Sequence, residues 1–230
     1  MSKVTQDAAR LNLPEEKLLG DWIVCIPGFT LEKYRQLQRS QLSIFAANCF
    51  GGNLYKLLGL PFRSPLINIG LYGENFIRFL NAPREYIKET PTFREQKINP
   101  KTGEKHNFVN IGDICMSILH YEKFEEFLEQ WEKRKTRVNW DNLFVESYTE
   151  ITYDKKFLEQ FDALPHPKKV CFVPFKSDLP SAWYVNPEVY KDFNLTFGFI
   201  VLHFSNGITP FYYDPFDMLL YGKKTPLIEM

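Results

Sequence analysis

The sequence lacks the short motifs that identify several large enzyme classes. It contains no P-loop, no GxGxxG dinucleotide fingerprint and no HExxH zinc-protease motif. A GxSxG nucleophile elbow is also missing. An Asp-x-Asp metal motif, which many glycosyltransferases use, does not occur either. These absences argue against P-loop NTPases, kinases, Rossmann dehydrogenases, zinc-dependent proteases and typical α/β-hydrolases.

The chain has no excess of charge of either sign, because its 28 basic residues match its 28 acidic residues. A balanced chain has no overall field that attracts polyphosphate, so we predict no nucleic-acid partner. The one basic cluster, Lys133-Arg134-Lys135 with Arg137, stands among glutamates and is interpreted first as a solvated helix face.

Long hydrophobic runs and paired cysteines are missing as well. No stretch approaches the ~20 apolar residues of a membrane span, and residues 1–19 lack the apolar centre of a signal peptide. None of the four cysteines is spaced as CxxC, which argues against a zinc knuckle, and we predict no metal site. We therefore expect a cytoplasmic protein with reduced thiols and no transmembrane segment. No pattern names a cofactor or an oligomeric state.

What the sequence does contain is enough apolar material for a large core, with 44% hydrophobic residues, 21 Phe and 12 Tyr in 230 residues. Continuous apolar runs predict strands buried on both faces. Amphipathic patterns between the runs predict helices. The alternation predicts an α/β fold, with a mostly parallel or mixed central sheet flanked by helices in three layers. The clearest strands are expected at residues 43–48, 143–148 and 169–175, and the clearest helices at 31–41, 74–80, 122–137 and 155–162.

Residues 1–30 are interpreted as an N-terminal extension, and residues 31–230 as a single α/β domain. Within this domain, residues 89–107 are expected to form an exposed loop or hairpin because of their prolines, glycine and charges. The apolar run at 197–204 is expected to be a further strand.

The stretch Asn48-Cys49-Phe50-Gly51-Gly52 follows the first predicted strand and is the sharpest candidate for chemistry. A thiolate nucleophile needs a lowered pKa, which a helix N-terminus or an imidazole supplies. Asn48 could donate to an oxyanion, and Gly51 and Gly52 could admit a ligand close to the backbone. The alternative is a small buried residue at a tight turn, with the glycines present for backbone shape.

His120 ends another apolar run just before a predicted helix. Strand ends at one edge of a sheet gather in one cleft, so His120 is the predicted general base for Cys49. Asp141, Asn139 or Asp214 would orient the imidazole. The alternative is a histidine that caps the helix and packs on aromatic neighbours. His203 is the reserve candidate, whereas His106 and His166 are expected in exposed loops.

Arg134 and Arg137 follow the apolar face of the predicted helix at 122–137, and Asn139 follows them. Arginines in such positions can hold a diphosphate or carboxylate with two hydrogen bonds, so these three residues are predicted to bind substrate. The alternative is that cationic residues simply favour a helix C-terminus.

Several blocks together resemble a known bacterial family, the domain-of-unknown-function family 1919. They are Asn48-Cys49-Phe50-Gly51-Gly52, Leu58-Gly59-Leu60, Ser64-Pro65, Phe76 to Leu80, His120-Tyr121, Trp131 to Asn139 and Tyr213-Asp214 to Tyr221-Gly222. The resemblance implies an α/β fold and a frequent genetic setting among capsule, exopolysaccharide or lipopolysaccharide genes, and it implies no established reaction. The pattern is also similar, more distantly, to a group of papain-like cysteine peptidases.

These observations leave three functional hypotheses for a small-molecule or glycan ligand. The first is a transferase of an acyl or similar group, or a hydrolase, that acts on surface-polysaccharide precursors through Cys49 and His120. The second is a glycosyl or phospho-substituent transferase in which Cys49 is structural. The third is a non-catalytic carbohydrate-binding or assembly protein.

Overall fold

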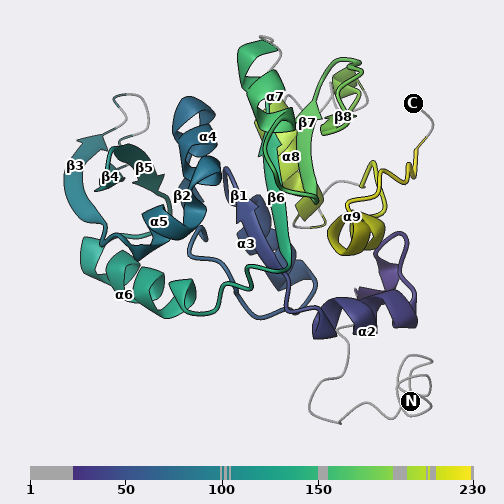
Figure 1. The fold of residues 1–230 in the computed structure, drawn as a ribbon, viewed down its shortest axis with the longest axis horizontal. Helices are drawn as coiled ribbons and strands as arrows, with labels where there is room; N and C mark the ends of the chain where they lie inside the picture. The colour runs from purple at the N-terminus through teal and green to yellow at the C-terminus, as the bar shows by residue number, and fades with distance from the viewer. Residues whose placement is uncertain are drawn as a thin grey trace.

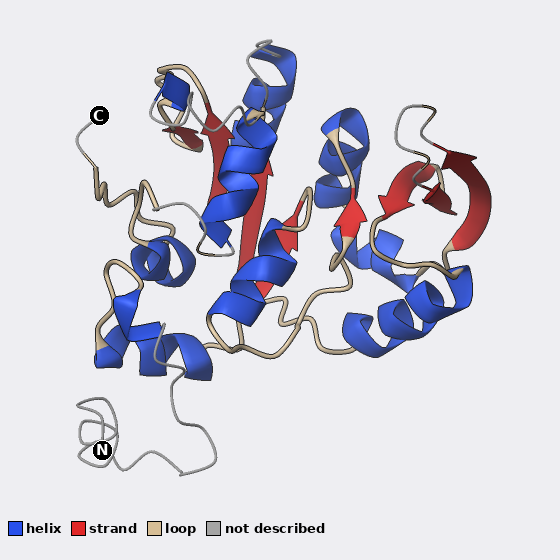
Figure 2. Ribbon diagram, turned by 180° about the vertical axis from the view of Figure 1, so that it is seen from behind, coloured by secondary structure: helices blue, strands red, loops and turns tan. Residues whose placement is uncertain are grey.

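The computed structural model describes residues 23–98, 100, 103, 105–149, 155–188, 196–205, 207 and 211–228 (Figure 1). Within them the chain forms two four-stranded sheets. Figures 1 and 2, which view the molecule from opposite sides, both show the second sheet beside the first rather than stacked on it. The pocket described below lies where these two sheets meet.

The first sheet is wholly parallel, with the strand order β1-β6-β7-β8. Its register aligns Ser43 with Leu143 and Ala46 with Glu146. Every residue of its first strand is buried, which explains why this strand is apolar without alternation. The strands are β1 (Ser43–Ala46), β6 (Leu143–Tyr148), β7 (Lys169–Val173) and β8 (Ala182–Tyr184).

Helices cover both faces of the parallel sheet, so the predicted three-layer α/β architecture is confirmed. One apolar core joins the sheet to α3 (Phe50–Leu57), α8 (Phe197–Ser205), α2 (Leu31–Arg39) and α9 (Pro215–Tyr221). The core on the other face includes α4 (Gly73–Asn81) and α7 (Lys155–Asp162).

The second sheet is antiparallel, with the order β2-β5-β4-β3. Its buried residues Val109 and Met116 share a core with Phe127 and Trp131 of the long helix α6. It meets the parallel sheet where the Leu71 N–H donates to the Ala47 carbonyl over 2.9 Å. The elements are β2 (Ile69–Gly70), β3 (Thr92–Ile98), β4 (Lys105–Ile111), β5 (Ile114–Ile118), α5 (Pro83–Lys88) and α6 (Phe124–Lys135). The predicted 89–107 hairpin is therefore the β3–β4 pair.

The expected strand at 197–204 is wrong, because this run forms helix α8. Phe197, Ile200, Val201 and Phe204 are buried, and they follow the i, i+3, i+4, i+7 spacing of one helical face. Phe199 stands on another side and is 54% exposed. Because the exposed position is also apolar, the run looked continuous and its helical period was hidden.

Helix α3 begins at Phe50, so the glycine pair lies in its first turn. A Cβ on Gly51 would lie 3.0 Å from Ile44 Cγ2, and one on Gly52 would lie 3.2 Å from Ile67 Cγ2. The glycines therefore let the start of the helix approach β1 and the neighbouring loop closely, at a cost in helix propensity.

The described part of the predicted N-terminal extension packs on the domain. The 3₁₀ helix η2 (Ile23–Cys25) places Ile23 in the same core as Leu37 of α2, and Ile26 follows it there. Residues 1–22 lie outside the described residues. None of the helices in the described part of the chain has the length and apolar character that crossing a bilayer needs.

Candidate functional site

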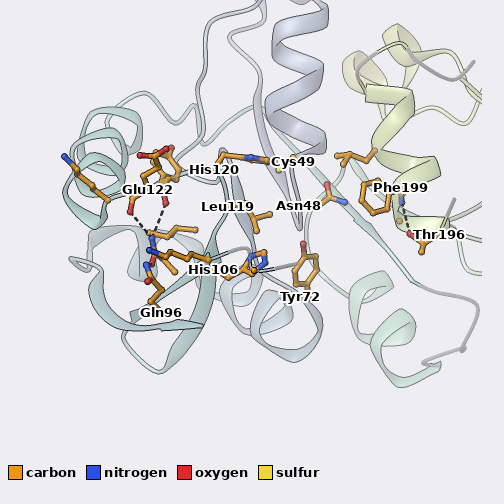
Figure 3. Close-up of a pocket in the computed structure, with 18 of the residues that line it drawn as sticks. Asn48, Cys49, Tyr72, Gln96, His106, Leu119, His120, Glu122, Thr196 and Phe199 are labelled. Atoms are coloured by element: carbon orange, nitrogen blue, oxygen red, sulfur yellow. Dashed lines mark hydrogen bonds between the residues drawn. The ribbon is translucent and has the colours of Figure 1, made fainter. Parts of the chain in front are cut away.

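A pocket of about 1120 Å³ lies where the two sheets meet (Figure 3). Asn48 and Cys49 enter it from the loop after β1, and Tyr148 from the end of β6. These strands are parallel, so both contributions come from the same edge of the sheet. The antiparallel sheet and the segment after it supply the opposite wall, which includes His106 and His120.

Cys49 is the N-cap residue of α3 and is only 7% exposed. Burial raises the pKa of its thiol, and the positive charge of Lys56 offsets only part of this rise. The thiol is therefore protonated at neutral pH, in contrast to the expectation that the helix N-terminus would lower its pKa. Reaction at Cys49 needs a base that takes the proton.

Asn48 is held rigidly beside Cys49. Its side-chain oxygen accepts a hydrogen bond from the Phe50 N–H over 2.7 Å, and only 5% of the residue is exposed. The side-chain oxygen of Asn48 therefore binds the first residue of α3. The side-chain amino group of Asn48 can still donate a hydrogen bond at the pocket.

His120 is an exposed residue just after β5, and its φ is +61°. A left-handed conformation is uncommon for a residue other than glycine, and it turns the chain sharply here. Figure 3 shows the His120 side chain extending toward Cys49 across the pocket. The structure therefore brings the predicted nucleophile and the predicted base to one pocket, although from two different sheets.

The residues predicted to orient His120 are placed elsewhere. Asp141 and Asn139 precede β6, at the amino edge of the parallel sheet, whereas Cys49 follows β1 at the carboxyl edge. The Asn139 N–H donates to Ser43 Oγ over 2.8 Å, and Asp141 lines a separate hollow of about 490 Å³. Asp214 caps α9 and pairs with a lysine of α2.

The predicted arginines do not line the pocket. Arg134 is 9% exposed and donates from Nη1 to the Tyr121 hydroxyl over 2.7 Å, while its guanidinium lies 5.2 Å from the centre of the Phe62 ring. Tyr121 itself lines the pocket, so Arg134 supports the wall from behind. Arg137 is exposed beyond the end of α6. Gly51 and Gly52 face Ile44 and Ile67.

Sequence reasoning missed several residues that line the pocket. His106 was expected in an exposed loop, but it is half-buried on β4 at the pocket. The alternation of buried residues along β4 was the signal that could have placed it on a strand. His203, the reserve candidate, lies on α8, one of its ring nitrogens is buried without a hydrogen bond, and it does not line the pocket.

Two tyrosines from different segments form one side of the pocket. The rings of Tyr72 and Tyr148 are 6.5 Å apart in an edge-to-face arrangement. A Cβ on Gly70 would lie 2.7 Å from the Tyr72 ring, and a Cβ on Gly198 would lie 2.8 Å from the Tyr148 ring. Both glycines are therefore required by the rings that pack over them.

Glu146 is a fully buried carboxyl group on the central strand β6. Neither side-chain oxygen makes a hydrogen bond of normal geometry with a described residue. Burial raises the pKa of Glu146 to about 8, and the nearby Ala47 N–H offsets only part of that rise. Glu146 is therefore uncharged at neutral pH.

The described residues contain no group of three His, Cys, Asp or Glu side chains that could hold a metal ion. The pocket itself presents the thiol of Cys49, the imidazoles of His106 and His120, and the amide of Asn48 beside the start of α3.

Comparison with known proteins places this fold and pocket in a family. The profile described as "Domain of unknown function (DUF1919)" matches residues 24–221, from η2 to the last residue of α9. The chain belongs to the DUF1919 family. An uncharacterised protein of Haemophilus influenzae is 28% identical over 185 residues, which covers 80% of this chain and 84% of that protein. The DUF1919 match spans both sheets, so the whole pocket lies within the shared domain.

Proposed function

We propose that this DUF1919 protein is a cysteine-dependent transferase that moves an acyl group from a donor to a hydroxyl acceptor. The observation that carries the proposal is that Cys49, at the start of α3, and His120, after β5, line the same pocket. Thioester chemistry is the natural use of a thiol that shares a pocket with an imidazole.

In the first step, His120 takes the proton of the Cys49 thiol as the sulfur attacks the acyl carbonyl carbon. The new S–C bond forms, the carbonyl electrons move to oxygen, and the tetrahedral intermediate collapses as the bond to the leaving group breaks. The His120 proton passes to that leaving group. Because the Cys49 pKa is raised, the proton transfer must accompany attack rather than precede it.

The oxyanion of this intermediate needs hydrogen-bond donors. Asn48 offers its amino group beside Cys49, and the first turn of α3 directs backbone N–H groups toward its own N-terminus. In the second step, His120 deprotonates the acceptor hydroxyl, and the acceptor oxygen attacks the carbonyl carbon of the thioester. The S–C bond then breaks, and the proton on His120 passes to the sulfur and restores the Cys49 thiol. Water as the acceptor would make the same site a hydrolase.

The acceptor class rests on what the family resemblance implies, which is a genetic setting among surface-polysaccharide genes. Sugar precursors of such polymers carry many hydroxyl groups, and these are suitable acyl acceptors. We therefore propose precursors of surface polysaccharide as the acceptors.

The test is trapping of the acyl-enzyme. The protein is incubated with activated acyl donors, such as acyl thioesters, and its intact mass is measured before and after acceptor sugars are added. We expect an adduct on Cys49 that disappears with acceptor and is absent in Cys49→Ala. Cys115→Ala is the matched control, because Cys115 is a half-buried thiol on β5 that does not line the pocket. Transfer that persists in Cys49→Ala would refute the proposal.

A second candidate is favoured by the burial and raised pKa of Cys49, which also suit a structural cysteine. In that case the pocket would transfer a glycosyl or phospho group without a covalent enzyme intermediate. Lys105 and Lys123 also line the pocket. Full turnover in Cys49→Ala, together with loss of turnover when these two lysines are replaced, would select this function.

A further inference from the structure

The wall of the pocket formed by the antiparallel sheet and the segment after it carries a local excess of positive charge. Among the described lining residues, Lys105, His106, His120 and Lys123 are basic, and Glu122 is the one acid. Neither Lys105 nor Lys123 forms an ion pair with a described residue. The balanced charge of the whole chain conceals this local excess.

Exposed aromatic rings also line the pocket, from α8 and from the segment after β2. Phe199 at the start of α8 is 54% exposed and Tyr72 is 48% exposed, and Tyr148 stands edge-on to Tyr72. In Figure 3, Phe199 and the basic residue His120 lie on opposite sides of Cys49. Exposed rings of this kind offer flat surfaces on which a base or a sugar ring stacks.

Two helices also begin at this pocket. Cys49 is the N-cap of α3, and Thr196 precedes α8, where its hydroxyl accepts from the Phe199 N–H over 3.4 Å. Helix N-termini carry partial positive charge and free N–H groups, which favour anions. Together with Lys105 and Lys123 they make the potential inside the pocket more positive.

From these walls we infer that the pocket binds a phosphorylated ring compound, with its phosphate toward Lys105 and Lys123 and its ring on Phe199 and Tyr72. The inference rests on the proposed function in one respect, since this compound would be the donor or the acceptor of the transferred group. The pocket volume of about 1120 Å³ exceeds the usual range for a single ligand, which leaves room for both partners. Nucleotides and sugar phosphates share the chemistry required.

Binding to the full chain is measured by calorimetry with ADP, glucose 1-phosphate, pyrophosphate and adenosine. We expect ADP or glucose 1-phosphate to bind about tenfold or more tightly than pyrophosphate or adenosine, because only the former occupy both walls. Whichever of ADP and glucose 1-phosphate binds more tightly shows whether the pocket prefers a nucleotide or a sugar phosphate.

The Lys105→Ala/Lys123→Ala variant should weaken this binding by about tenfold or more, and Phe199→Ala should weaken it several-fold. Lys133→Ala is the matched control, because Lys133 is an exposed lysine of α6 outside the pocket. Thermal unfolding of each variant verifies that it is folded.

The inference is overturned if neither phosphorylated ring compound binds, if pyrophosphate binds as tightly as they do, or if the double lysine variant behaves like Lys133→Ala. Cys49→Ala should bind ADP or glucose 1-phosphate as tightly as the unchanged protein does, because the inferred contacts do not include the Cys49 thiol. Loss of transfer with normal binding in that variant supports both proposals, whereas normal binding with normal transfer refutes only the Cys49 mechanism.

Discussion

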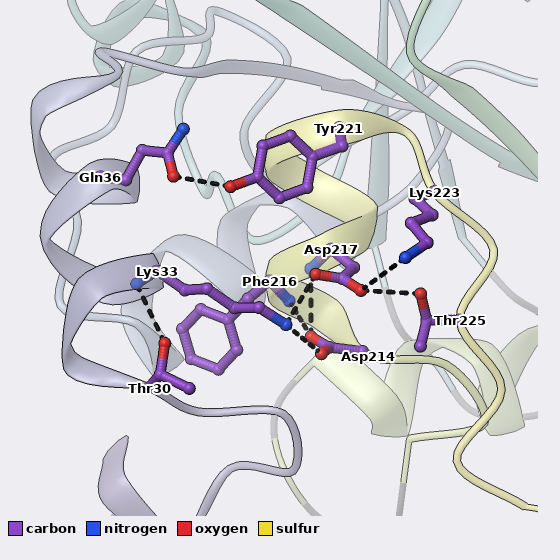
Figure 4. A network of polar contacts seen from close by, with 9 residues as sticks. All are labelled: Thr30, Lys33, Gln36, Asp214, Phe216, Asp217, Tyr221, Lys223 and Thr225. Atoms are coloured by element: carbon purple, nitrogen blue, oxygen red, sulfur yellow. Dashed lines mark hydrogen bonds and ion pairs between the residues drawn. The ribbon is translucent and has the colours of Figure 1, made fainter.

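The polar cluster between α2 and α9 and the polar cluster of the pocket differ in how their charges are matched. In the first, Lys33 Nζ lies 2.7 Å from Asp214 Oδ2 and 2.6 Å from Asp217 Oδ1 (Figure 4). Thr225 donates to the other oxygen of Asp217 over 2.7 Å. Burial alone would raise the Asp217 pKa, but the hydrogen bonds from Lys33 and Thr225 bring it below its ordinary value.

Asp214 also accepts from the N–H groups of Phe216 and Asp217, so it caps α9 while it holds Lys33. A Cβ on Gly28 would lie 2.2 Å from its carboxyl carbon. This cluster fastens α2, α9 and the C-terminal segment together, and its two carboxylates are engaged by partners within the protein.

In the pocket, by contrast, Lys105 and Lys123 form no ion pair with a described residue, and the exposed rings of Tyr72 and Phe199 line the same pocket. Matched polar groups stabilise a fold, whereas unmatched ones in a cavity keep their binding capacity for a ligand. This difference shows that a cluster of charged side chains does not by itself indicate a ligand-binding site.

The largest effect should come from His120→Asn, which removes the proposed general base and leaves the polar cluster between α2 and α9 intact. We expect the transfer rate to fall by about 100-fold or more, with an unchanged free energy of unfolding because His120 is exposed. His166→Asn is the control, since His166 binds the Leu80 carbonyl away from the pocket. Equal transfer rates for the two variants would show that His120 takes no part in the reaction.

Glu146→Gln tests the buried carboxyl group. Because its pKa is raised from 4.5 to about 8 in the folded protein, the folded state holds an extra proton between these values. The free energy of unfolding should therefore fall as pH rises from about 5 to about 8, by up to several kcal/mol. Urea unfolding across this range should show that Glu146→Gln, but not the exposed Glu129→Gln, lacks this contribution. The same pH dependence in all three proteins would contradict the assignment.

Asp214→Ala disrupts the polar cluster between α2 and α9. The free energy of unfolding should fall by about 2–4 kcal/mol, because the change removes a helix cap and leaves Lys33 without one of its partners. Ligand binding at the pocket should be unchanged. Urea unfolding measures the loss, and the exposed Asp178→Ala serves as the reference. Weaker ligand binding in folded Asp214→Ala would show that the two clusters are coupled.

The smallest effect is expected for Asp141→Ala, since Asp141 lies at the opposite edge of the parallel sheet from Cys49. Transfer should change by less than about twofold, within the usual range for distant surface changes. A loss as large as that of His120→Asn would restore Asp141 as the group that orients the imidazole.

Strands and helices with clean patterns were predictable from local sequence. The strand over 143–148 and the helix over 155–162 have the predicted bounds, because burial on both faces or on one face leaves a direct trace in residue type. Helix α8 was not predictable in this way, since Phe199 is apolar at a position that faces a pocket rather than a core.

By itself, the sequence determined the α/β class, the buried strand before Cys49, and the pairing of Cys49 with His120 as candidates for one site. Only the tertiary structure decided that His120 comes from a second, antiparallel sheet, and that Asp141 and Asn139 lie at the far edge of the first. It also decided that Arg134 supports Tyr121, while Lys105 and Lys123 line the pocket. The physical reason is that residue patterns record local burial, whereas the side chains that share a cavity are chosen by how distant segments pack.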